Sequence, residues 1–197
     1  MSLILTGAEI LQVLDMDLAL QADEAAFRAY GEGRVNMPPK AYLQLPKGDF
    51  RAMYGAITLE EAEVCGLKWV NVHPENPRRG LPTVMAKIIL NDPASALELA
   101  DMDGTYITNY RTGAAGGLAV QYLARPEAAR LGLIGAGVQA RMQVAAILKV
   151  RPIREITIYN RSLARAQNLM GELASRCGIQ VKVATTPEEA VRGQDIV

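Results

Sequence analysis

The chain has 197 residues, half of them hydrophobic, and its 21 basic and 21 acidic residues cancel, so the formal net charge is zero. This length suits one large or two small domains with a real core, and the balanced charge argues against a nucleic-acid partner. No apolar run approaches the roughly 18 residues of a membrane span, and no secretory signal pattern opens the chain, so we predict a cytoplasmic protein without a membrane partner. A single histidine and two distant cysteines do not fit a zinc site, and we predict no metal.

The first segment predicts two helices. Thr6 and Glu9 have the spacing of a capping box and precede an apolar stripe, which indicates the start of a short helix. Asp15 or Asp17 can cap a second helix, which the glycines at 31 and 33 end.

After Met37-Pro-Pro-Lys40, which cannot be helical, the pattern changes to strands. They are expected at Ala41–Leu45, Asp49–Tyr54, Cys65–Val70, Val84–Leu90 and Leu97–Asp101. Segments rich in proline, glycine and asparagine separate them and mark turns. This pattern predicts an antiparallel meander, followed by a long helix from Thr105 to Ala124.

From Ala129 onward, strands and helices alternate. The expected strands are Leu131–Ile134, Glu155–Tyr159 and Ile179–Ala184, and the expected helices are Val138–Val150, Ser162–Arg176 and Pro187–Val191. Alternation at this spacing predicts βαβ units and a parallel sheet, so the fold class is α/β, of the Rossmann type, with an antiparallel α+β domain before it.

The two patterns predict two domains, residues 1–128 and residues 129–197. Asp195-Ile-Val197 has the pattern of a fourth strand. A doubly wound nucleotide-binding domain has two βαβαβ halves, and only the first is present. We therefore expect the Rossmann domain to be truncated and the chain to be a fragment of a longer polypeptide.

The stretch LGLIGAGVQA, from Leu131 to Ala140, has the features of a dinucleotide-binding loop. Gly135 follows an apolar strand and permits a tight turn, and Gly137 lets a pyrophosphate approach the backbone. The helix that begins near Val138 directs its first N–H groups toward the phosphates. The alternative is a generic glycine turn of an α/β protein, and we favour dinucleotide binding because the strand and helix context is the one the mechanism requires.

The end of the next strand distinguishes the two nicotinamide cofactors. NAD sites usually carry an acidic residue there, but Asn160 is uncharged and Arg161 and Ser162 follow it. A guanidinium and a hydroxyl suit a 2′-phosphate, whereas a carboxylate would repel it. We therefore predict NADP(H), with NAD(H) as the alternative if Arg161 is only a solvated charge.

Cations among apolar neighbours recur in the first domain, at Lys40, Arg51, Lys68 and Arg111. Taken singly, each is more readily explained as a solvated charge on a strand or helix. Taken together, they suggest an anionic substrate such as a carboxylate, but they do not identify it.

Motifs in order along the chain carry a family resemblance. They are Met37–Lys40, Gly48–Met53, Gly66–Val70, His73–Pro77, Gly80–Ala86, Met102–Thr108, Arg111–Ala115 and Gly135–Ala140. Together they resemble the ornithine cyclodeaminase/mu-crystallin family, which includes archaeal-type alanine dehydrogenases and ketimine reductases. The first half looks most similar to the archaeal-type alanine dehydrogenases.

The resemblance implies a homodimer in which the antiparallel domain carries the substrate site and the dimer interface. Arg51 and Lys68 would be the catalytic residues that hold the substrate, and Lys40 would be a further substrate-side lysine. Arg111 would lie where substrate carboxylate and cofactor meet, and Thr83 would line the same cleft. The cofactor contacts implied by the loop and the resemblance together are Thr83, Arg111, Thr112, Gly135, Gly137, Val138, Gln139, Asn160, Arg161 and Ser162.

The reaction implied by the resemblance is NAD(P)-dependent hydride transfer at an amino-acid/imino-acid pair. Two alternatives stay open: an ornithine cyclodeaminase, which recycles its NAD, and an NADPH-dependent small-ligand binder without turnover. The family also uses an aspartate as general acid and base, which is expected beyond Val197.

Overall fold

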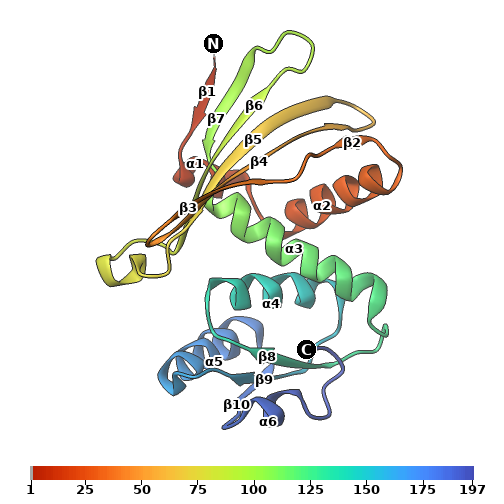
Figure 1. Cartoon of the computed structure of the whole chain (residues 1–197). Coiled ribbons are helices and arrows are strands. Elements are labelled where there is room, and N and C mark those ends of the chain that lie inside the picture. The colour runs from red at the N-terminus through yellow and green to blue at the C-terminus, as the bar shows by residue number, and fades with distance from the viewer. Residues whose placement is uncertain (1) are drawn as a thin grey trace. The chain divides into compact units, whose positions relative to one another are not determined.

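The computed structural model describes residues 2–197 (Figure 1). The chain forms two compact units, each of which is described on its own. The first unit contains the chain up to Asp15 together with Gln21–Thr108, and the second contains Met16–Leu20 together with Asn109–Val197. The division into domains 1–128 and 129–197 concerns independent folding and remains a prediction.

A seven-stranded sheet forms the first unit. Its strands are β1 Leu3–Leu5, β2 Val35–Asn36, β3 Ala41–Leu45, β4 Gly48–Thr58, β5 Glu63–Val72, β6 Val84–Asn91 and β7 Glu98–Asp103. The order is β1-β7-β6-β5-β4-β2, and β3 also pairs with β4. The five predicted strands are confirmed. Their antiparallel meander is also confirmed, because β3, β4, β5, β6 and β7 each pair antiparallel with the next. The additional strand β1 pairs with β7 in parallel. The sequence did not predict β1 and β2, which are too short to show a period of two.

The helices that begin in the first part of the chain are α1 Gly7–Val13, α2 Met16–Gly31 and the 3-10 turn η1 Asn76–Arg79, and a longer helix, α3 Thr105–Leu123, follows the sheet. The predicted capping box at α1 is confirmed: Thr6 and Glu9 bond reciprocally. Asp17 is wrong as a cap of α2, because it lies inside the first helical turn. There its carboxylate favours the helix through the dipole instead of through a cap bond.

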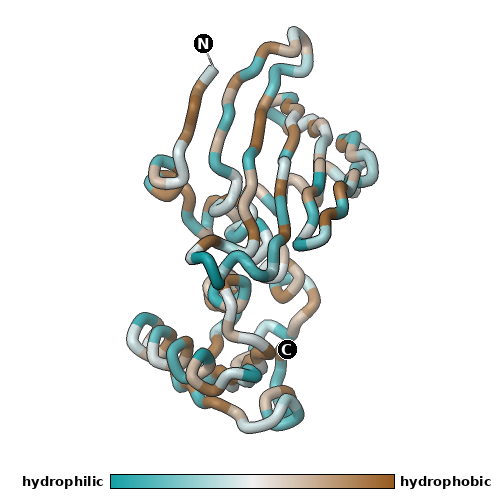
Figure 2. Tube along the Cα trace, turned by 60° about the vertical axis from the view of Figure 1, so that its left-hand side comes forward, coloured by the Kyte–Doolittle hydropathy of each residue, from teal (hydrophilic) through white to brown (hydrophobic). Residues whose placement is uncertain are grey.

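The core of the first unit lies on one face of the sheet. Ala100 and Met102 of β7 are buried there with Ile10 of α1, and Ile88 and Leu90 of β6 pack against them. Figure 2 shows hydrophobic and hydrophilic residues alternating along the strands, as expected for a sheet that buries one face against helices.

The second unit is a parallel three-stranded sheet with helices on both faces (Figure 1). Its strands are β8 Arg130–Ile134, β9 Glu155–Tyr159 and β10 Gln180–Val183, and its helices are α4 Val138–Val150, α5 Leu163–Cys177 and α6 Pro187–Val191. The strand order is β10-β9-β8, and Ile196 forms a parallel bridge with Leu131 of β8. The predicted strand from Asp195 is thus present only as this single bridge, on the side of β8 where a doubly wound nucleotide-binding sheet has its fourth strand.

Packing in the second unit depends on the alternation of β9. Ile156 and Ile158 are fully buried in one cluster with Val144 of α4 and Leu169 of α5. The opposite face meets α6: a Cβ on Gly132 of β8 would lie 2.4 Å from the Ala190 carbonyl. Glycine at this position therefore lets α6 approach the strand.

Helix α3 packs tightly against α4 through glycines. A Cβ on Gly113 would lie 2.6 Å from the Met142 carbonyl oxygen, and one on Gly117 would lie 2.7 Å from the Ala146 side chain. Both glycines belong to the run of small residues that follows Arg111, and these small residues let the backbone and side chains of α4 come close.

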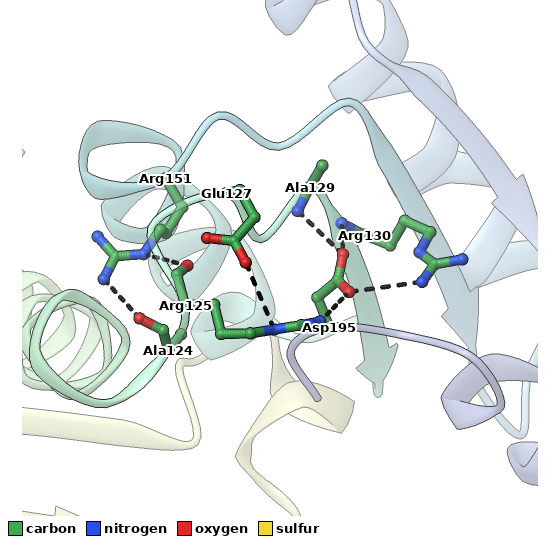
Figure 3. Close-up of polar contacts among 7 residues, drawn as sticks. All are labelled: Ala124, Arg125, Glu127, Ala129, Arg130, Arg151 and Asp195. Atoms are coloured by element: carbon green, nitrogen blue, oxygen red, sulfur yellow. Dashed lines mark hydrogen bonds and ion pairs between the residues drawn. The ribbon is translucent and has the colours of Figure 1, made fainter.

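The connection from α3 to β8 is held by one carboxylate (Figure 3). Asp195 Oδ2 accepts hydrogen bonds from the backbone N–H groups of Ala129, at 3.0 Å, and Arg130, at 2.9 Å. Its Oδ1 pairs with the guanidinium groups of Arg125, at 2.8 Å, and Arg130, at 3.4 Å. The Ala129 N–H, followed by the Arg130 bonds, lowers the pKa of Asp195 to about 2.

Arg151 holds the end of α3 in the same region (Figure 3). Its guanidinium donates to the carbonyl oxygens of Gln121, at 2.6 Å, Ala124, at 2.8 Å, and Arg125, at 3.0 Å. The last carbonyls of a helix have no partner within the helix, and a cation at this end also favours the helix dipole.

Among the described residues, no helix is long and apolar enough to cross a membrane.

Candidate functional site

Strand register places two predicted cations of the first unit, Arg51 and Lys68, on one sheet face. Arg51 on β4 pairs with Tyr42 on β3 and with Val70 on β5, and Met53, two residues on, pairs with Lys68. Directly paired residues share a face, and so do residues two apart along a strand. Arg51 and Lys68 are therefore diagonal neighbours, typically about 7–8 Å apart between their backbones.

Asp49 holds the guanidinium of Arg51 from the side. Arg51 Nε donates to Asp49 Oδ1 at 2.7 Å, and Nη2 donates to Oδ2 at 3.0 Å. The two side chains are half-buried, with 30% and 16% of their surface exposed. The bonds from Arg51, with smaller electrostatic contributions from Arg51, His73 and Lys40, lower the pKa of Asp49. This pairing uses the Nε side of the fork and fixes its plane, which is the preorganisation that a bidentate carboxylate site needs.

Tyr42 extends the cationic cluster. Its ring lies 5.4 Å from the guanidinium carbon of Arg51 and 5.4 Å from Lys40 Nζ. Both distances lie within the range of cation–π attraction. Tyr42 therefore keeps Lys40 close to Arg51, although Lys40 itself is exposed just before β3. Three cations and one carboxylate leave the face positive, which suits an anion.

Thr83 and His73 are joined at the end of β5. The His73 N–H donates to the Thr83 carbonyl oxygen at 2.8 Å, so the predicted Thr83 lies just before β6. Buried Asn71 accepts from the Met85 N–H with Oδ1, at 3.1 Å, and its Nδ2 lies 2.9 Å from His73 Nδ1. The amide is thus oriented with its NH2 toward the ring, so neutral His73 carries its proton on Nε2.

The glycine loop of the second unit has the geometry of a phosphate cradle. Gly135 has φ +110°, in the region that side chains avoid. Its N–H donates to the Tyr159 carbonyl at 2.8 Å, which joins the ends of β8 and β9. A Cβ on Gly137 would meet nothing of the chain within 4 Å, so the space in front of the loop is open to a ligand. The residues present therefore fit a pyrophosphate at the start of α4.

The segment after β9 carries the three polar residues that the sequence predicts beside the adenosine end of a dinucleotide. Asn160 Nδ2 donates to the Ser162 carbonyl at 2.9 Å, which stabilises the turn into α5. Ser162 is the N-cap residue of α5, but its hydroxyl makes no capping bond, and Arg161 is exposed. The Ser162 hydroxyl, which does not cap α5, and the exposed Arg161 guanidinium are thus neighbours in the chain.

Four other predicted residues also belong to the second unit. Arg111 and Thr112 lie on α3, whereas Val138, which is exposed, and Gln139 are the first two residues of α4. Gln139 Nε2 donates to Asn109 Oδ1 at 3.3 Å, and Gln143 Nε2 donates to the Thr112 carbonyl at 3.1 Å. These two bonds join α3, which carries Arg111, to α4, which follows the glycine loop. The described residues contain no group of three metal-ligating side chains.

The sequence-based site did not include Asp49 or Tyr42. A signal was present, because Asp49 and Arg51 are two apart in a strand and must share a face. The contribution of Tyr42 had no such signal, since it depends on the register between β3 and β4.

A comparison with known families identifies the chain. The model of the ornithine cyclodeaminase/mu-crystallin family matches residues 1–197. The chain belongs to this family. An alanine dehydrogenase of Archaeoglobus fulgidus is 45% identical over 94% of the chain. The chain spans 60% of the length of that relative.

Solved structures of family members agree with the fold. An archaeal alanine dehydrogenase dimer with bound NAD is 46% identical and superposes with a TM-score of 0.89, over 96% of this chain and 57% of that one. The Thermococcus litoralis Delta(1)-pyrroline-2-carboxylate reductase, in complex with NADH and L-proline, is 35% identical with a TM-score of 0.92, over 98% of this chain and 60% of that one. The resemblance stated from the motifs is thereby confirmed.

Proposed function

We propose that the complete natural protein containing this chain is an NAD(P)-dependent oxidoreductase that acts on an α-amino acid/imino acid pair, as an alanine dehydrogenase or a ketimine/pyrroline-2-carboxylate reductase does. The observation that carries the proposal is the half-buried Arg51 fork, oriented by Asp49 on the same sheet face as Lys68. The family match and the names of the two relatives with solved structures support it.

Arg51 is proposed to bind the substrate carboxylate. Asp49 occupies Nε and one N–H of Nη2, so the Nη1 end of the guanidinium faces the incoming anion. Lys68 is proposed to polarise the imine or carbonyl through Nζ, since an ammonium next to the reacting group stabilises developing negative charge. Lys40 adds positive charge to the same cluster, and Thr83 is proposed to line the cleft.

The nucleotide is proposed to bind the second unit. When bound, it supplies or accepts the hydride. Gly135, Gly137, Val138 and Gln139 form its pyrophosphate loop, and Arg111 and Thr112 of α3 are proposed as further contacts. Asn160, Arg161 and Ser162 favour NADP(H), whereas NAD and NADH are the nucleotides named for the two related structures. A homodimer is also proposed, by analogy with the related dehydrogenase dimer.

The deciding experiment follows nucleotide absorbance with the complete natural protein. NADPH and NADH are offered separately with pyruvate plus ammonia, with pyrroline-2-carboxylate, and with ornithine. Consumption of nucleotide with either of the first two supports the proposal. Ammonia release from ornithine without net change in nucleotide means a cyclodeaminase, and binding without turnover of any substrate means a ligand binder.

A further inference from the structure

Arg141, one turn into α4, folds back under the glycine loop. Its Nη1 donates to the carbonyl oxygens of Ala136, at 3.2 Å, and Gly137, at 3.1 Å. Its Nε donates to Glu172 Oε2 of α5 at 2.8 Å. The Arg141 and Glu172 side chains are both about two-thirds buried, with 32% and 30% of their surface exposed. One guanidinium therefore links the loop to the next helix.

The charge of Arg141 is compensated where it lies. A cation at the start of a helix opposes the helix dipole, so an isolated arginine there is unfavourable. The carboxylate of Glu172 and the two loop carbonyls offset that cost. Glu172 also has a second partner, Arg176, at 3.5 Å, but that side chain is 75% exposed and lies one turn further along α5.

The two carbonyl bonds determine the direction of the loop N–H groups. In a trans peptide the C=O and N–H of one unit point in opposite directions. Because Arg141 binds the carbonyls of Ala136 and Gly137, the N–H groups of Gly137 and Val138 point away from it. These N–H groups belong to the start of α4, where helical partners are lacking, and the space beside Gly137 is open.

We propose that Arg141 is a positioning residue for the dinucleotide: anchored by Glu172, it holds the loop so that the N–H groups of Gly137 and Val138 face the pyrophosphate. This inference rests on the proposed nucleotide-binding function and adds a pair of residues to it. Arg141 acts through the backbone and does not contact the phosphates. The affinity for pyrophosphate-containing ligands thus depends on an ion pair behind the loop.

The first test measures dissociation constants of NADPH and NADH by fluorescence titration of the complete natural protein. Arg141→Met keeps an unbranched, flexible stem but removes both carbonyl bonds, and we expect the dissociation constants to rise about tenfold, the size expected for losing hydrogen bonds from a charged donor. Arg141→Lys keeps the cation but cannot bond the loop and Glu172 as a fork, so it should recover only part of the affinity.

Glu172→Gln separates positioning from direct charge attraction. If Arg141 positions the loop, weakening of its anchor weakens nucleotide binding about threefold or more, because the strongest of its bonds loses its charge assistance. If Arg141 instead attracted the phosphates directly, removal of a nearby negative charge would tighten binding. Arg176→Gln is the matched control, since it removes the other ion pair of Glu172, and it should leave nucleotide affinity unchanged.

A comparison of ADP with AMP keeps the test independent of general damage to the fold. Disorder in the unit weakens both ligands equally, whereas loss of loop positioning lowers the preference for ADP over AMP. Wild-type protein that binds no dinucleotide overturns the proposed function itself. Wild-type binding together with unchanged affinities in Arg141→Met, or tighter binding in Glu172→Gln, overturns only the role of Arg141.

Discussion

The first unit presents its candidate site through side chains, and the second presents its site through the backbone. In the first unit, Arg51 is held by Asp49 and lies beside the ring of Tyr42, so the geometry depends on three side chains from two strands. In the second unit, Gly135 and Gly137 offer peptide groups with open space in front of them. The first candidate site offers charged side chains to a ligand. The second offers the peptide dipoles of a turn whose shape suits a phosphate.

This difference determines how each site responds to substitution. A side-chain site fails when one charged group is removed, because the remaining groups are left with uncompensated charge. A backbone site tolerates most side-chain changes but fails when a Cβ fills the space that the ligand needs. Substitutions that separate substrate affinity from nucleotide affinity therefore test the comparison directly.

The largest effect is expected from Arg51→Lys. Lysine keeps the charge but loses the planar fork, so kcat/KM for the carboxylate substrate should fall about 100-fold, while the dissociation constant of NADPH stays unchanged. Steady-state kinetics and fluorescence titration of the complete natural protein measure the two quantities. Arg78→Gln is the control, because Arg78 is a 79% exposed arginine of the same unit. Equal losses in both quantities would contradict the separation of the sites.

Gly137→Val should weaken nucleotide binding by about tenfold or more without unfolding the protein. A Cβ at this position meets nothing of the chain, and the φ of −88° is open to any residue, so the bound pyrophosphate is the group that the new side chain obstructs. Gly171→Val, at an open position on α5, is the control and should leave nucleotide affinity unchanged. If Gly137→Val lowers the thermal midpoint no more than Gly171→Val does and leaves nucleotide affinity unchanged, the glycine loop does not bind the pyrophosphate.

Arg161→Gln tests the preference for NADP. Loss of a guanidinium near the 2′-phosphate should raise the dissociation constant of NADPH about fivefold and leave that of NADH unchanged. The control is Arg165→Gln, one turn further along the exposed surface of α5. If NADH and NADPH respond equally, Arg161 is a solvated charge and the prediction of NADP(H) is wrong.

The smallest effect is expected from Asp195, and it concerns stability. Asn at this position cannot accept all of the bonds from Ala129, Arg125 and Arg130, and we expect the thermal midpoint at pH 7 to fall by roughly 5 °C. The pKa of Asp195 is lowered to about 2 in the folded protein. Its contribution to the free energy of unfolding is therefore fully present at pH values above the ordinary pKa of an aspartate, and it is lost as the pH falls through the folded-state pKa.

The pH dependence supplies the check on Asp195. The difference in midpoint between wild type and Asp195→Asn should be constant above pH 4 and shrink between pH 4 and pH 2. Other carboxylates titrate in the same range, but the difference between the two proteins removes their contribution. A difference that persists unchanged at pH 2 would show that the carboxylate charge is not what stabilises the segment from α3 to β8.

The regular elements were predictable because their signals are local. Helix α4 and strands β3 and β9 match their predicted bounds, since each has a strong period and clear flanking residues. Strands β1 and β2 were missed because two or three residues carry no period, and they exist only through pairing with β7 and β4. Asp17 was named as a cap because sequence alone cannot separate a cap from a first-turn carboxylate.

The sequence by itself determined the family, the order of the elements and the glycine loop, because motif spacing and periodicity reside in the chain. Only the tertiary structure decided that Tyr42 lies beside Arg51 and that Arg141 and Glu172 hold the loop, since those contacts depend on strand register and on the packing of α4 against α5. The pairs of Arg51 with Asp49 and of Arg141 with Glu172 illustrate the two cases: the first lies two residues apart in one strand, and the second joins two helices. A residue's neighbours in space are decided by the fold, whereas its conformational preferences are decided by its neighbours in sequence.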